Sequence, residues 1–171
     1  MNIAHSIQSI DFLTTFSESV LAYPIVLSIH LACIALFGGM ILMTNLRLLG
    51  LTFKNVPITE MVTSLRPWKR GGGVIMITTG LLLATSEAEK YAPNPFFWTK
   101  MVALGLIGMH ALIFRRIVYH QTEELDRSPV IATKAKVAAI LSLGLWTTMF
   151  VMGRLIAYWD HPDLLPPVSR N

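Results

Sequence analysis

The chain carries few charged residues for its length. Of its 171 residues only 14% are Asp, Glu, Lys or Arg, whereas 53% are hydrophobic. The mean hydropathy is +0.56. A soluble domain has about 25% charged residues, because charge covers the surface that faces water. This shortage excludes an ordinary soluble domain, and the high apolar content excludes a disordered chain. Together they favour an integral membrane protein.

Cysteine and the common enzyme motifs are scarce as well. Cys33 is the only cysteine, which excludes a disulfide scaffold and a CxxC site. The chain has no HExxH motif, and Gly71-Gly72-Gly73 lacks the Lys-Ser/Thr pair of a phosphate-binding loop. Basic residues exceed acidic ones by only four, 14 against 10, and they lie beside apolar runs. The pI of about 9.5 therefore indicates a membrane topology signal and not nucleic-acid binding.

Four segments are apolar enough to cross a bilayer, which takes roughly 20 such residues. They run from about 20 to 44, 68 to 84, 96 to 118 and 137 to 159. None shows the alternation of a barrel strand, so we predict an all-α integral membrane four-helix bundle. Residues 1–19 would form an amphipathic leader on the outer surface, 20–160 the membrane domain, and 161–171 an extended tail. The leader lacks Lys and Arg, so we expect no cleaved signal peptide.

Basic residues predict the orientation. Ten of the fourteen lie in the loops that join the first span to the second and the third to the fourth: Arg47, Lys54, Arg66, Lys69, Arg70, Arg115, Arg116, Arg127, Lys134 and Lys136. Loops rich in Lys and Arg stay in the cytoplasm. Both termini are therefore predicted on the outer side.

Proline and asparagine predict several helix ends. Pro57-Ile58-Thr59-Glu60 reads as a helix start, and Arg66-Pro67-Trp68 would end or kink that helix. Pro93-Asn94-Pro95 would set the start of the third span.

Two histidines lie deep in apolar segments, His30 in the first span and His110 in the third. Ionisable groups inside a bilayer are costly, face the bundle interior and mark function by default. The first and third spans run in the same direction, and counting residues places both imidazoles within one turn of the same level. Two facing imidazoles are the axial arrangement of a b-type haem, so we predict His30 and His110 as its metal ligands. The alternative is a pair of interhelical hydrogen bonds.

Arg154, near the outer end of the fourth span, is the predicted partner of a haem propionate, with Lys100 assisting. Its alternative role is to reach the outer headgroups. Met76 or Met109 could replace one histidine as an axial ligand. His5, His120 and His161 are most simply solvated or interfacial side chains.

Several short motifs carry a resemblance. The run from His30 to Leu51 (HLACIALFGGMILMTNLRLLGL), Arg66-Pro67-Trp68, Asn94-Pro95-Phe96 with Lys100-Met101, and the segment from Gly153 to Tyr158 resemble a family of small bacterial four-span membrane proteins of unassigned function. The likeness covers about residues 20 to 160 and implies a multi-pass protein of the bacterial inner membrane with periplasmic termini. More loosely, histidines on two parallel spans are similar to the haem-bearing half of respiratory b-type cytochromes.

The sequence thus predicts a membrane b-type cytochrome or electron-transfer subunit that holds one haem b and passes electrons between quinol and a periplasmic redox protein. It would not be a complete enzyme, because no loop has room for a catalytic domain. The rival is a cofactor-free membrane protein that transports a small solute or acts as a scaffold subunit. A homo-oligomer and membership of a larger complex both stay open.

Overall fold

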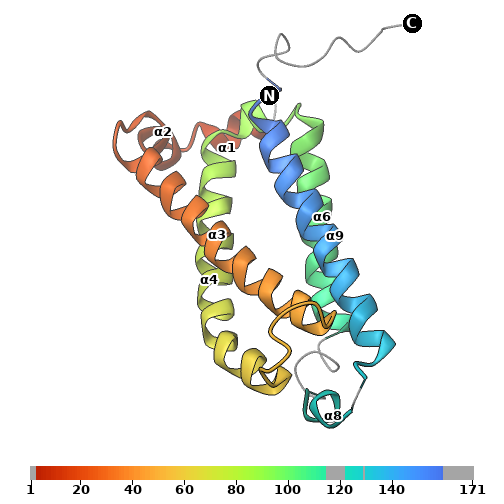
Figure 1. Ribbon diagram of the computed structural model, residues 1–171. Coiled ribbons are helices and arrows are strands. Elements are labelled where there is room, and N and C mark those ends of the chain that lie inside the picture. Colours follow the sequence, from red (N-terminus) through yellow and green to blue (C-terminus); the bar gives the residue numbers. More distant parts are fainter. Residues whose placement is uncertain (1–2, 115–121, 129, 160–171) are drawn as a thin grey trace, which may run out of the picture.

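The computed structural model describes residues 3–114, 122–128 and 130–159. Every regular element in these ranges is a helix, as predicted (Figure 1). The helices are α1 Ile3–Gln8, α2 Asp11–Glu18, α3 Ala22–Leu48, α4 Ile58–Ser86, α5 Ala88–Tyr91, α6 Pro95–Ile113, α8 Thr122–Arg127 and α9 Thr133–Ile156.

The four long helices, α3, α4, α6 and α9, form the body of the molecule. Helix α3 packs against both α4 and α9, and α6 packs against α9. Helices α1 and α5 lie at one end of this bundle, with the start of α6 and the end of α9 (Figure 1). Helix α8 and the loop 49–57 lie at the other end. We refer to these as the α5 end and the α8 end.

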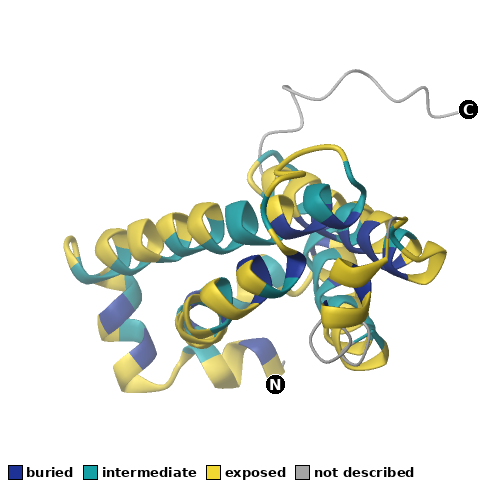
Figure 2. Ribbon diagram, turned by 60° about the horizontal axis from the view of Figure 1, so that its bottom comes forward, coloured by how far each residue is buried: buried dark blue, intermediate teal, exposed yellow. Residues whose placement is uncertain are grey.

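Three of the long helices, α3, α6 and α9, are long and apolar enough to cross a membrane. Large apolar side chains cover their outward sides, among them Leu36, Val102 and Leu112, which are 71%, 61% and 73% exposed. Exposed residues run along the outward faces of the helices in Figure 2. A surface of this kind indicates a membrane protein. The predicted second span lies within α4, and its two basic residues and four glycines lower the hydropathy.

Helix α4 begins where the sequence predicts, directly after Pro57, but it does not end at Pro67. Buried side chains on either side hold the helix together across this proline. Val62 packs in an apolar cluster at the α8 end with Leu48 and Leu125, and Met76 packs in a second cluster with Trp146. Because tertiary packing outweighs the backbone hydrogen bond lost at Pro67, the predicted short helix and second span form one helix.

Local residues set the other helix ends. Helix α6 starts at the Pro93-Asn94-Pro95 segment, as predicted. Asn94 caps it: its side-chain oxygen accepts hydrogen bonds from the backbone N–H groups of Phe96 and Phe97 at 2.9 and 3.3 Å. Gly50 follows the end of α3 with a φ of +75°, a left-handed conformation in which glycine has no steric penalty.

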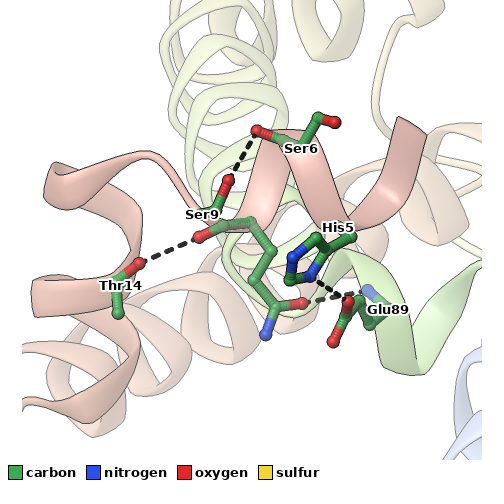
Figure 3. Close-up of polar contacts among 6 residues, drawn as sticks. His5, Ser6, Ser9, Thr14 and Glu89 are labelled. Atoms are coloured by element: carbon green, nitrogen blue, oxygen red, sulfur yellow. Dashed lines mark hydrogen bonds and ion pairs between the residues drawn. The ribbon is translucent and has the colours of Figure 1, made fainter. Parts of the chain in front are cut away.

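The predicted leader forms two short helices, α1 and α2, and α1 is joined to α5. His5 Nδ1 lies 2.7 Å from a carboxylate oxygen of Glu89, and the backbone N–H of Glu89 donates to the side chain of Gln8 at 2.9 Å (Figure 3). The Thr14 hydroxyl, from α2, donates to the backbone carbonyl of Gln8 at 3.0 Å. Both His5 and Glu89 are exposed, so this contact lies on the surface of the α5 end.

Candidate functional site

His30 lies on the side of α3 that faces α4, eight residues after the helix begins. Its Nδ1 is 2.8 Å from the hydroxyl oxygen of Thr79. That hydroxyl has one proton, which it donates to the backbone carbonyl of Ile75 at 2.7 Å. In the tautomer in which this hydroxyl donates to Ile75, Nδ1 donates to Thr79 and Nε2 of the neutral ring carries a lone pair. A histidine that ligates a metal is usually held in this way through its other nitrogen.

Two further residues shape the surroundings of His30. A Cβ added to Gly80 would lie 3.0 Å from the imidazole carbon Cε1, so the absence of a side chain lets the ring rest against α4. The ammonium group of Lys100 lies close enough to interact electrostatically with His30. The Lys100 side chain runs along Gly153 of α9, where an added Cβ would be 3.7 Å from Nζ. The region around His30 thus combines an imidazole, a glycine and a cation.

His110 has a different environment. It lies three residues before the end of α6, and its Nε2 is 2.9 Å from the backbone carbonyl of Ala138 on α9. A carbonyl can only accept, so Nε2 carries the proton and Nδ1 the lone pair. The imidazole also stacks at a tilt on Phe114, with ring centroids 4.8 Å apart. His110 therefore acts here as a hydrogen bond between α6 and α9.

The structure does not bring the predicted site residues together. His30 contacts α4 in the half of the bundle toward the α5 end, whereas His110 contacts α9 near the α8 end. Arg154 is exposed and bonds to a residue just after its own helix: its Nη2 donates to the Tyr158 hydroxyl at 3.0 Å, and the guanidinium lies 5.0 Å from the centroid of that ring. His120 and His161 lie outside the described residues.

A cavity of about 560 Å³ lies between the helices, toward the α8 end. Its apolar wall includes Phe37, Ile41, Met76 and Trp146, and its polar part includes Lys69 and His110. His30 is not among the residues that line it. Pockets of this size hold small molecules.

Lys69 is the charged group most deeply placed in this cavity, with 9% of its surface exposed. Its ammonium donates to the Thr44 hydroxyl at 2.6 Å, and that hydroxyl in turn donates to the carbonyl of Met40 at 2.8 Å. Nearby, the Asn45 amide donates to the Ser142 hydroxyl at 2.9 Å, and this buried bond joins α3 to α9.

The sequence interpretation assigned Lys69 to a cytoplasmic loop, as a topology signal. A signal for its burial exists in the spacing of α4: Val62, Lys69, Met76 and Leu83 are each seven residues apart, and all four are buried. Seven residues make about two helical turns, so the four share one face. A lysine in register with three buried apolar residues marks an interior position.

The chain matches a known family over residues 13–159, from α2 to the last described residue. It belongs to the family described as "Family of unknown function (DUF6644)". This membership confirms the resemblance to a family of unassigned function. No curated protein and no solved structure matches the chain. All four long helices, with His30, Lys69 and His110, lie within the segment that matches the DUF6644 family.

The surroundings of His30 fit part of what a haem requires. They offer a ring nitrogen with a lone pair, a glycine on the facing helix, and an ammonium group that can pair with a propionate. His110 does not fit in the same way, because its Nε2 donates to Ala138. No group of three or more His, Cys, Asp or Glu gathers among the described residues. That does not bear on haem, whose iron takes one or two axial ligands.

Proposed function

We propose that this DUF6644 protein is a membrane haem protein, a b-type cytochrome or electron-transfer subunit, with His30 as an axial ligand. The observation that carries the proposal is the hydrogen bond between His30 Nδ1 and the Thr79 hydroxyl, 2.8 Å long. Thr79 holds its Nδ1–H, so Nε2 is free of a proton and can donate its lone pair. Haem b, when bound, would supply one-electron chemistry.

The chain's own residues would orient and stabilise the group. Thr79 fixes the rotation of the His30 ring, as an outer partner of a metal ligand does. Gly80 lets the imidazole rest against α4, and Lys100 can pair with an acidic substituent. Arg154 at the α5 end is the second cation proposed for a propionate, and His110 is the second histidine proposed as a ligand.

We propose four spans, with α4 as the second, and both termini on the periplasmic side of the bacterial inner membrane. Helix α4 has 29 residues, or about 43 Å at 1.5 Å per residue, and it packs along α3. The basic residues Lys54, Arg127 and Lys134 lie toward the α8 end, which the positive-inside rule assigns to the cytoplasm. Alkaline phosphatase fused after Trp159 should be active, and fused after Lys54 inactive. The reverse result would overturn this orientation.

We propose membrane quinol and a periplasmic redox protein as the electron-transfer partners. Location supports this choice, since His30 and Lys100 lie in the half of the bundle toward the α5 end. The measurement is haem reduction by a quinol in proteoliposomes. Failure of any quinol to reduce a haem that dithionite reduces would exclude quinol as donor.

The test of haem binding is a reduced-minus-oxidised spectrum of the purified protein with a pyridine haemochrome assay. We expect a b-type α band at about one haem per chain. His30→Ala should abolish it, and His5→Ala, which changes an exposed residue of α1, should retain it. His110→Ala tests the second ligand. A colourless protein after haem-replete expression would exclude a cytochrome, and an unchanged band in His30→Ala would exclude His30 as the ligand.

A cofactor-free solute transporter is the second candidate, and the cavity around Lys69 is the observation that favours it. A colourless protein that moves a solute across vesicles would establish it. A scaffold subunit instead predicts that replacing His30 and His110 by Leu leaves assembly intact.

A further inference from the structure

We propose that the cavity toward the α8 end binds an amphipathic anion, and that Lys69 anchors its acidic group. The ligand would combine an anionic oxygen group, such as a carboxylate, with an apolar body. This inference does not depend on His30 as a haem ligand, because His30 does not line the cavity; His110, the second proposed ligand, does line it.

The charge of the cavity is of one sign. Three basic residues line it, Arg66, Lys69 and Arg70, and none of the described residues that line it is acidic. A low-dielectric cleft that is lined by charges of one sign raises the local concentration of ions of the opposite sign. The ligand that suits this cavity is therefore an anion.

Lys69 is the residue that selects an anion most strongly. An ammonium has three donors, and the contact with Thr44 uses one of them. Within the described part of the chain, no ion pair includes Lys69. A buried charge without a partner is costly, and an acidic oxygen placed beside it would offset that cost with charge-assisted hydrogen bonds.

The uncharged polar side chains beside Lys69 are already hydrogen-bonded within the bundle, so the acidic group of the ligand would bind to Lys69. Asn45 donates to Ser142, and His110 donates to the Ala138 carbonyl, so both side chains already use a donor within the bundle. The wall formed by Phe37, Met76 and Trp146 is apolar and faces the same space. An apolar body would lie against this wall while the acidic group reaches Lys69.

Two sources supply this chemistry, a free amphipathic acid and the headgroup of an anionic lipid. We would measure binding of radiolabelled laurate to the full chain in phosphatidylcholine nanodiscs, with dodecanol as the uncharged analogue. Laurate should bind about tenfold or more tightly than dodecanol. Lys69→Met should remove that difference, whereas Lys134→Met, which changes an exposed lysine at the start of α9, should preserve it. Displacement of laurate by phosphatidylglycerol would identify a lipid headgroup, and no displacement a free acid.

Equal affinity of the wild type for laurate and dodecanol, or an unchanged preference in Lys69→Met, would overturn the proposal. Should Lys69→Met fail to fold, a second measurement keeps Lys69 intact. With the other three tryptophans changed to Phe, 12-bromododecanoate should quench Trp146, which lines the cavity, and 12-bromododecanol should not. Equal quenching by both would overturn the proposal. The haem content of Lys69→Met should match the wild type, so this test and the test of haem binding can fail independently.

Discussion

The two halves of the bundle hold their partly buried histidines in opposite ways. Toward the α5 end, His30 donates through Nδ1 to a side-chain hydroxyl and keeps a lone pair on Nε2. Toward the α8 end, His110 donates through Nε2 to a backbone carbonyl. Each half also has its own cation, the partly buried Lys100 or the buried Lys69. A histidine in an apolar helix is thus not evidence of ligation by itself, because its partner decides which nitrogen is available.

The largest expected effect comes from removing the partner of His30. Thr79→Val keeps the shape of the side chain but leaves the Nδ1–H without its acceptor. We expect unfolding in mixed micelles to require about 1–3 kcal/mol less free energy, because the partly buried Nδ1–H loses its acceptor. Thr78→Val, at an exposed neighbouring position, is the control. Equal stability of the two variants would mean that Thr79 does not determine the His30 tautomer.

A similar change cannot be made for His110, since its acceptor is a backbone carbonyl. The stability of the α8 end can instead be tested through another residue. There, Asp126 of α8 caps the start of α4. Its two carboxylate oxygens accept the backbone N–H groups of Ile58 and Thr59 at 2.6 and 2.9 Å. Partial burial raises the pKa of Asp126, but the hydrogen bonds from Thr59 and Ile58 and the charge of Arg47 outweigh burial and lower it overall.

A carboxyl group with a lowered pKa stabilises the fold only while it is ionised. Its contribution is present above the pKa of the unfolded chain, about 3.9, and is lost as the pH falls through the lower pKa of the folded state. Asp126→Asn should cost about 0.5–2 kcal/mol at pH 7, as loss of a helix cap does. It should also flatten the fall in stability below about pH 4. A steep acid dependence that persists in Asp126→Asn would assign it to another group.

Sequence alone predicts the features that depend on neighbouring residues. The all-helical fold, the start of α6 at Asn94-Pro95 and the start of α4 after Pro57 follow from hydropathy and capping. The continuation of α4 through Pro67 does not, because packing of Val62 and Met76 on distant helices decides it. The separation of His30 from His110 was also missed: residue counts placed both rings at one level, whereas His30 lies 8 residues after the start of α3 and His110 lies 15 residues after the start of α6.

The buried pair Asn45 and Ser142 gives the smallest effect and the most direct test of how the α8 half is held together. The amide donates to the hydroxyl at 2.9 Å between α3 and α9. Ser142→Ala and Asn45→Ala form a double-mutant cycle, and we expect a coupling energy of about 0.6 kcal/mol, the average for polar pairs between membrane helices. Ser28, exposed on the same helix as Asn45 and bonded within it to Pro24, supplies Ser28→Ala as a control partner with no coupling. If Asn45 and Ser142 show no coupling, apolar packing alone holds α3 against α9 in this half. The shape of the cavity beside Lys69 then does not depend on the hydrogen bond between Asn45 and Ser142.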